Sequence, residues 1–189
     1  MSAATNYTTQ NELLLNNLLE FYKNDDNLTR MLKIITGESK ISLRIVDWFA
    51  TNYAKKNYTL YGMTNQSGDN IRFKVYFDYK LKLKAYSKKR FDPFCRWDRI
   101  SIPYKDGTCI ETTIGQLNFF KWALENKVID YIDEHYDEIE KDMNNRNSTS
   151  KRKDSITDNS KTRKKREELS ISATKSIKKE EVEIVVKFH

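Results

Sequence analysis

The feature that most limits the fold of this chain is the point at which its apolar pattern stops. Apolar side chains recur at helical or strand spacing from Leu14 to Met143, and polar and charged residues dominate beyond that point. A segment with few periodic apolar residues cannot bury enough surface to offset the entropy of ordering its backbone. We therefore expect one compact domain over residues 1–143 and a disordered basic tail over residues 144–189.

The charge of the chain divides at the same boundary. Residues 144–189 contain 13 of the 34 basic residues and 7 of the 27 acidic residues. Residues 1–143 are nearly neutral, with 21 basic and 20 acidic side chains. The formal net charge of +7 therefore belongs almost entirely to the tail and does not describe the surface of the domain.

The first part of the domain, about residues 9–57, contains three helix signals. Thr9 and Glu12 have the spacing of a capping box, in which the two side chains satisfy free amides at the start of a helix. A second helix is followed by Gly37, because glycine most readily ends a helix in the left-handed conformation. A third series of apolar residues at helical spacing runs from Ile41 to about Asn57.

The middle part, about residues 58–112, is basic and mixed in its secondary structure. Residues 58–61 and 71–77 are strand-like and are separated by a loop rich in turn-forming residues. Residues 78–88 fit both periods, since their apolar side chains continue the strand alternation and also fit one face of a helix. We favour a strand that gives way to a helix near Asp78.

The end of the domain combines a hairpin with helices. Two short strands over residues 99–103 and 108–112 are joined by a turn sequence suited to a hairpin. Thr113 and Gln116 form another capping box, which opens the first of two helices predicted over about residues 113–143. The predicted class is therefore α+β, with N-terminal helices, a small antiparallel sheet and C-terminal helices.

Residues 71–105 form a strongly basic segment, with 11 basic and 3 acidic side chains interleaved with aromatic rings. Cations can neutralise phosphates and exposed rings can stack on bases, so this pattern is typical of a nucleic-acid-binding surface. The alternative, which we favour for most of the rings, is that they form the core. The lysines would then solvate its outer face or guard a sheet edge. The candidate nucleic-acid-binding residues of the domain are Lys80, Lys82, Lys84, Lys88, Lys89, Arg90, Arg96 and Arg99.

The tail contains basic clusters set among Ser, Thr and Asn. Such clusters suit a nuclear-import signal or a nucleic-acid contact, and phosphorylation of neighbouring serines would weaken either. The candidate residues of the tail are Lys151, Arg152, Lys153, Lys161, Arg163, Lys164, Lys165 and Arg166. The alternative is a solvated linker whose last residues, 182–188, alternate in a way that could add a strand to the domain or to a partner.

Residues 125–142 have the opposite charge, with 8 acidic and 2 basic side chains. One interpretation is that this acidic helix packs near the basic segment and stabilises it. The other is that it shields the basic surface or docks a basic partner such as the tail. We favour the first.

Residue types suited to catalysis are scarce. His135 and His189 are the two histidines, so a histidine-based nucleophile system is not expected. Cys95 and Cys109 cannot complete a zinc site, and we expect free thiols, with a disulfide between them as the alternative. The five glycines form no phosphate-binding loop. We expect no catalytic, metal or cofactor site, although a carboxylate-based activity stays open.

Several strings of residues are distinctive rather than compositional. They are Ile41–Arg44, Asp47–Phe49, Thr51–Tyr53, Leu83–Lys89, Phe91–Arg96 and Thr112–Trp122. In these strings the chain resembles a family of small uncharacterised proteins of giant DNA viruses, the mimivirus and phycodnavirus group, over about residues 40–143. The resemblance implies a viral protein that works in an infected cell. It implies no established activity and no catalytic residues.

Two functions follow as hypotheses. The first is a non-enzymatic DNA- or RNA-associated viral protein that assists genome packaging, replication or late transcription. The alternative is a structural or scaffold protein whose domain binds another viral protein. The chain has no apolar run long enough to cross a bilayer and no signal-peptide pattern at its start. We therefore expect no membrane association and a place in the host cytoplasm at the virus factory, in the nucleus or in the virion.

Overall fold

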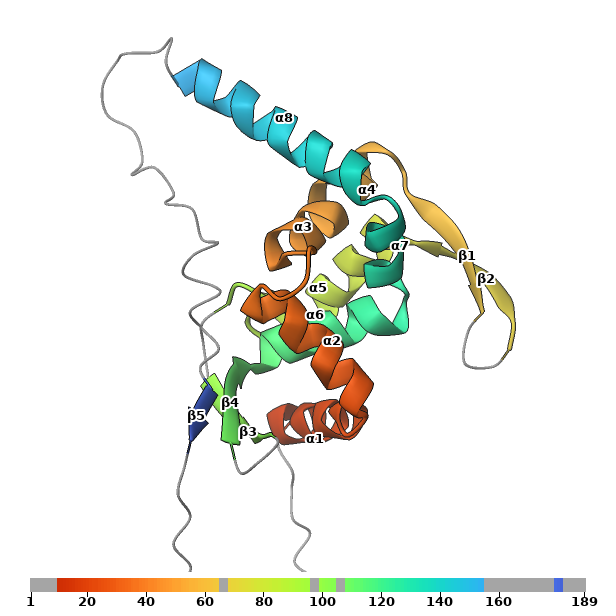
Figure 1. Cartoon of the computed structure of the whole chain (residues 1–189). Helices are drawn as coiled ribbons and strands as arrows, with labels where there is room; N and C mark the ends of the chain where they lie inside the picture. The colour runs from red at the N-terminus through yellow and green to blue at the C-terminus, as the bar shows by residue number, and fades with distance from the viewer. Residues whose placement is uncertain (1–9, 65–67, 96–98, 105–107, 155–178, 182–189) are drawn as a thin grey trace, which may run out of the picture.

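The computed structural model describes residues 10–64, 68–95, 99–104, 108–154 and 179–181 (Figure 1). The helical elements are α1 (Gln10–Tyr22), α2 (Asp25–Thr36), α3 (Leu43–Trp48), the π-helical turn η1 (Phe49–Tyr53), α4 (Ala54–Lys56), α5 (Val75–Phe91), α6 (Ile114–Glu125), α7 (Val128–Glu134) and α8 (Tyr136–Asp154). The strands are β1 (Leu60–Thr64), β2 (Asn70–Lys74), β3 (Arg99–Pro103), β4 (Thr108–Thr113) and β5 (Lys179–Glu181). Helices and antiparallel strands in one body confirm the predicted α+β class.

Helix α6 forms the centre of the domain. It packs against α1, α2, α5 and α7, and nearly all of its residues are buried (Figure 1). The predicted capping residue is confirmed, because the Thr113 hydroxyl accepts a hydrogen bond from the Gln116 amide at 3.1 Å. The Gln116 side chain departs from the capping-box pattern, since its carbonyl accepts from the Thr112 hydroxyl at 3.0 Å. The cap therefore also fixes the junction between β4 and α6.

An aromatic cluster joins α6 to α5. Phe119 and Trp122 of α6 have ring centroids 5.6 Å apart, and Phe91 of α5 lies 5.8 Å from each of them. Tyr79, also on α5, lies 5.8 Å from Trp122. These rings are buried, and pairs at such distances are stabilised by their geometry in addition to their burial. The cluster therefore fixes which face of α5 is turned inward.

The strands form two small antiparallel sheets. In the first, Tyr61 of β1 faces Phe73 of β2, and both pack on the core. In the second, β4 lies between β3 and β5, with Ile102 of β3 opposite Ile110 of β4. The predicted hairpin over residues 99–112 is confirmed by the β3–β4 pair.

The predicted change from strand to helix is confirmed, but it comes three residues before Asp78. Strand β2 ends at Lys74 and helix α5 begins at Val75. The Val75 amide donates to the Thr59 carbonyl at 3.3 Å. This hydrogen bond is the last between the β1 and β2 sides of the sheet, at the point where α5 begins. Val75 and Tyr79 are both buried, as expected for residues one helical turn apart. The helix favoured for residues 78–88 is present, with a break in its backbone at Ser87, where φ is 64°.

The predicted boundary at residue 143 is also displaced. Helix α8 continues to Asp154, so Asn144 is not the first residue outside the ordered domain. Arg146 explains part of this extension, because its guanidinium donates to the Asn52 side chain at 3.3 Å and lies 5.5 Å from the Trp48 ring. Residues 155–178 and 182–189 lie outside the described residues. The disorder predicted for this part of the tail and the strand predicted over residues 182–188 both concern these residues and stay predictions.

Candidate nucleic-acid interface

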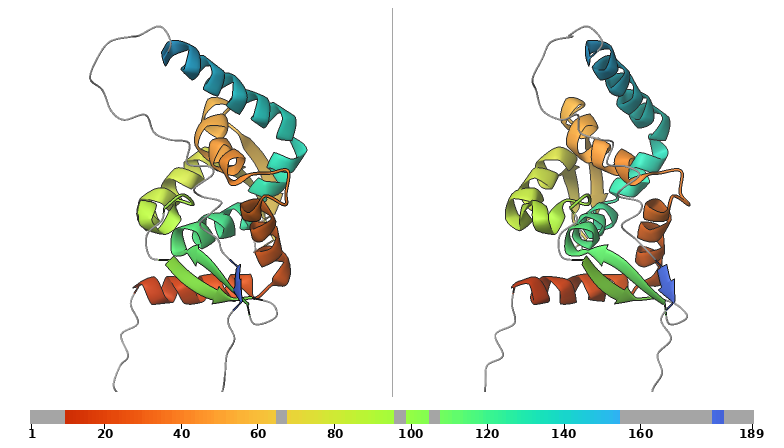
Figure 2. Two further views of the ribbon diagram at one scale, coloured as in Figure 1. Left: turned by 60° about the vertical axis from the view of Figure 1, so that its left-hand side comes forward. Right: turned by 90° about the vertical axis from the view of Figure 1, so that its left-hand side faces the viewer.

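The orientation of α5 on the domain is fixed by polar as well as apolar contacts. The Trp122 indole N–H donates to the Asp78 carboxylate at 2.6 Å, and the Asn118 side-chain amide donates to the Arg90 carbonyl at 2.9 Å. These bonds tie both ends of α5 to the buried helix α6. The charged side chains on the opposite side of α5 are consequently held toward solvent, and Figure 2 shows α5, in yellow-green, on the outside of the domain.

The outer side of α5 carries three exposed lysines, Lys80, Lys84 and Lys88, which we call the α5 basic face. Lys80 and Lys84 lie one helical turn apart and share a side with Phe77. Lys88 is exposed beyond the break at Ser87. In the described part of the chain these three lysines form no ion pair. Their charges are therefore free to act on a ligand.

The other candidates of the basic segment are distributed differently. Lys82 and Arg90 are half-buried, and Lys89 is exposed but has a partner. Arg99 forms an ion pair with Glu111 of β4 at 3.2 Å. Arg96 lies outside the described residues. The idea that an alternating lysine row guards a sheet edge is wrong, because Lys80, Lys82 and Lys84 lie on a helix and do not share one side of it.

The tail candidates divide into two groups. Lys151, Arg152 and Lys153 belong to the end of α8 and not to a separate tail. Lys161, Arg163, Lys164, Lys165 and Arg166 lie outside the described residues. The structure therefore brings three of the predicted tail cations onto a helix that is part of the domain.

The acidic segment does not pack as favoured from the sequence. Its carboxylates pair with cations from the N-terminal part of the domain. Asp130 of α7 pairs with Arg30 of α2, and Asp133 of α7 pairs at 2.9 Å with Lys40, between α2 and α3. Among the described residues, none of the ion pairs formed by its carboxylates reaches the α5 basic face. The acidic helices thus neutralise a different part of the domain.

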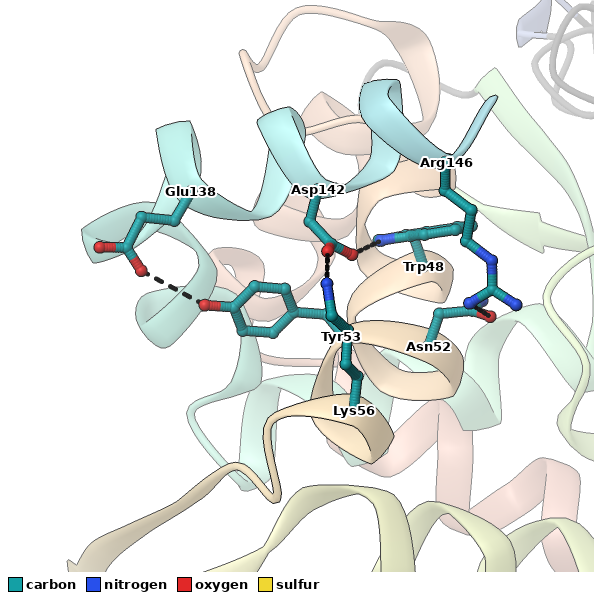
Figure 3. Close-up of polar contacts among 7 residues, drawn as sticks. All are labelled: Trp48, Asn52, Tyr53, Lys56, Glu138, Asp142 and Arg146. Carbon is teal, nitrogen blue, oxygen red and sulfur yellow. Dashed lines mark hydrogen bonds and ion pairs between the residues drawn. The ribbon is translucent and has the colours of Figure 1, made fainter. Parts of the chain in front are cut away.

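Figure 3 shows how α8 is held against α3, η1 and α4. The carboxylate of Asp142 accepts a hydrogen bond from the Trp48 indole N–H at 3.2 Å and forms an ion pair with Lys56. One turn earlier, the Glu138 carboxylate accepts from the Tyr53 hydroxyl at 3.3 Å. Asp142 is thus the polar centre of this contact, and it serves two donors at once.

Replacing Asp142 by alanine should weaken the attachment of α8. The Trp48 indole and the Lys56 ammonium would lose their acceptor, and we expect the free energy of unfolding to fall by about 1–2 kcal/mol. Asp137→Ala is the matched control, because Asp137 is an exposed carboxylate at the start of the same helix. Urea denaturation of both variants measures the difference. Equal stability of the two variants would show that the contact does not hold α8.

The structure adds cations and rings that were not among the candidate residues. In the β1–β2 register Leu60 faces Lys74 and Gly62 faces Arg72. These four residues share the side of the hairpin opposite Tyr61 and Phe73, which pack on the core. Arg72 and Lys74 are both exposed. The alternation of residues 71–77 contained this signal, because it places every second residue on the solvent side. The exposed ring of Phe77 carried no such signal, because it fitted the apolar side of the predicted strand.

Asp47 of α3 is a largely buried carboxyl close to Asp92 at the end of α5. Burial, and to a smaller extent the neighbouring carboxylate of Asp92, raise the pKa of Asp47 to about 7. Asp92 itself has a local role, because its side chain accepts the Phe94 amide at 2.9 Å. Asp47 is therefore a group of the domain whose charge changes near neutral pH.

Other chemistry is limited in the part of the chain that is described. Cys95 and Cys109 are free thiols. Among the described residues no three His, Cys, Asp or Glu side chains are placed to hold a metal ion. No described helix is both long enough and apolar enough to span a bilayer.

Comparison with known proteins identifies the family. The model of a family of unknown function, DUF7197, matches residues 2–188. The chain belongs to this family. A relative, the uncharacterized protein L507 of Acanthamoeba polyphaga mimivirus, is 42% identical over 153 residues, which cover 78% of this chain and 59% of the relative. No solved structure matches the chain.

These findings confirm the resemblance to uncharacterised giant-virus proteins. They also extend it, since the DUF7197 match covers residues 2–188, whereas the distinctive strings covered about 40–143. The chain spans 59% of the length of the mimivirus relative, so that relative contains further sequence beyond the shared part.

Proposed function

We propose that this protein is a non-enzymatic, nucleic-acid-associated viral protein that assists genome packaging, replication or late transcription in the infected cell. The observation that carries the proposal is the α5 basic face. Its lysines are exposed on a helix that α6 holds rigidly, and in the described residues they have no acidic partner. A cation without a partner at a fixed position is suited to neutralise a phosphate and release its counterions.

The placement of the acidic side chains supports the same proposal. If the carboxylates of α7 and α8 paired with α5, they would cancel its positive potential. They pair instead with Arg30, Lys40 and Lys56 of other elements. The nearly neutral domain therefore has separate acidic and basic regions, and a basic region of this kind attracts an anionic polymer.

The basic residues after α8 supply a second, less specific contribution. We propose that Lys161 and the cluster 163–166 attach to phosphates without reading sequence, while Lys151–Lys153 extend the basic surface from the end of α8. Such contacts give affinity that falls steeply with salt. The domain and the tail then contribute additively to attachment, and the site of action is the virus factory, the nucleus or the virion.

Substitution of two lysines of the α5 basic face tests the proposal. In the full chain, Lys80→Gln/Lys84→Gln is expected to weaken binding of mixed-sequence oligonucleotides by roughly tenfold or more at 0.1 M salt, because two phosphate contacts are lost. The matched control is Lys33→Gln/Lys141→Gln, which removes two exposed helical lysines elsewhere. Fluorescence anisotropy measures both. An equal loss of affinity in the two variants would show that only the net charge of the protein matters. That result would refute a binding site on α5.

The scaffold alternative predicts a different result in cells. The tagged protein would be purified from infected cells with and without nuclease. If its partners are lost after nuclease treatment, nucleic acid mediates the association. If viral proteins stay bound after that treatment, and the oligonucleotide affinity is negligible, the protein acts as a scaffold.

A further inference from the structure

A groove opens beside the α5 basic face, where the end of α4 and the start of β1 meet the junction of β2 and α5. Its volume is about 390 Å³, and its lining includes Lys55, Tyr58, Lys74, Tyr76 and Phe77. This volume lies within the range of small-molecule sites. The lining contains two lysines and no carboxylate. A ligand for this groove therefore combines apolar or aromatic faces with negative charge.

Two rings at the groove are exposed to an unusual degree. Tyr58 is 79% exposed and Phe77 is 60% exposed. Phe77 begins the same side of α5 that continues to Lys80 and Lys84, so the groove and the α5 basic face form one continuous surface. A third ring, that of Tyr76, is partly buried and has the ammonium of Lys55 5.6 Å from its centroid.

The backbone at Tyr58 is strained, because it has a conformation that glycine adopts more readily than tyrosine. Tyr58 has φ 48° and directly follows Asn57, the C-cap of α4, and the Thr59 amide donates to the Ala54 carbonyl at 3.1 Å. This is the bonding pattern of a helix end at which glycine is the usual residue. The tyrosine there makes the fold less stable than glycine would, and its ring is directed to solvent instead of the core. Strain of this kind is concentrated at functional positions.

We propose that this groove stacks unpaired bases, so that the protein prefers single-stranded nucleic acid to duplex. The inference rests on the proposed function and names the ligand class for the same surface. Exposed rings can stack on the faces of bases only where those faces are accessible, and a duplex covers them with neighbouring base pairs. The phosphates that flank the stacked bases would contact Lys74 on one side and Lys80 and Lys84 on the other.

The groove suits a nucleic acid better than an acidic peptide because its cations extend along a path. Arg72 and Lys74 are exposed on the outer side of the hairpin, and Lys80 and Lys84 continue along α5. The regularly spaced phosphates of a nucleic acid can each contact one cation of this series. A peptide anchored by one side chain in the groove would use only the apolar pocket and leave the other cations without a contact. A protein ligand is kept as an outcome of the test.

The test uses the full chain and two labelled probes, a 20-nucleotide single strand and the corresponding duplex. Tyr58→Gly/Phe77→Ala removes both rings with residues that favour the local backbone, so the fold should be retained. The matched control, Tyr58→Phe/Phe77→Tyr, keeps both rings. We expect the wild type to bind the single strand at least tenfold more tightly than the duplex, since each stacked base contributes roughly a factor of ten. The ring-free variant should lose most of that preference, and the control should keep it.

Several outcomes would overturn the inference, and they distinguish its failure from that of the proposed function. Equal affinity of the wild type for both probes, or unchanged single-strand affinity of the ring-free variant, would show that the rings do not stack bases. Loss of a nuclease-resistant protein partner by the ring-free variant, with single-strand affinity unchanged, would assign the groove to a protein. In these cases the proposed function stands if Lys80→Gln/Lys84→Gln still weakens binding. If neither probe binds, the proposed function fails together with the inference.

Discussion

Replacing Gly115 by valine is expected to lower the free energy of unfolding by about 3 kcal/mol, because α6 and the end of α5 approach too closely there for a side chain. A Cβ at position 115 would lie 2.9 Å from the Asp92 carbonyl oxygen and 3.1 Å from the Lys89 carbonyl oxygen. Both atoms belong to the backbone, so they cannot move aside as a flexible side chain would. The strain would separate α5 from α6 and disturb the helix that carries the α5 basic face.

Gly62→Val is the matched control for this variant. Gly62 lies in β1, and a Cβ there would meet no atom within 4 Å. Valine also favours strands, so this substitution should change stability by less than about 0.5 kcal/mol. Thermal and urea denaturation of the two variants measure the difference. If Gly115→Val is as stable as Gly62→Val, the close packing of α5 on α6 is not a constraint on the fold.

Replacing Asp47 by asparagine should stabilise the protein at high pH. Burial raises the pKa of Asp47 to about 7, and in the unfolded chain the carboxyl titrates near its ordinary value of about 3.9. Between these values the folded protein binds more protons than the unfolded chain, so this group makes stability fall as the pH rises from about 4 to about 7. Above that range the penalty of a buried charge is complete and constant.

The asparagine variant has no such titration. Relative to the wild type, we expect Asp47→Asn to gain about 2 kcal/mol of unfolding free energy between pH 5 and pH 8. Asp137→Asn, at an exposed position of α8, should follow the wild type across this range. Urea denaturation at several pH values gives the curves. A constant difference between Asp47→Asn and the wild type would show that the folded-state pKa of Asp47 is ordinary.

Local signals with a defined mechanism predicted the fold well. Gly37 ends α2 with φ 80°, and Thr113 caps α6, as their positions in the sequence indicated. The β3–β4 hairpin was readable because its turn sequence separates two short apolar runs. These features depend on residues close together in the chain, so no knowledge of tertiary contacts was needed.

The predictions were wrong where contacts between residues distant in sequence decide the local structure. The alternation of residues 71–77 continues without a break across the start of α5 at Val75, and only packing on α6 selects the helix. Composition indicated disorder from Asn144, but Arg146 has partners at Trp48 and Asn52 that are distant in sequence. The exposure of Phe77 likewise follows from the orientation of α5. The candidate site was therefore predicted in its residue types and not in its geometry.

The most direct test of the central claim is the salt dependence of single-strand binding by the full chain. The dependence of log Kd on log salt would be compared for the wild type, Lys80→Gln/Lys84→Gln and Lys33→Gln/Lys141→Gln. If Lys80 and Lys84 contact phosphates, the slope for their variant should be shallower by about 1.4, while the control stays parallel to the wild type. Three parallel lines would contradict the claim that the α5 basic face binds nucleic acid.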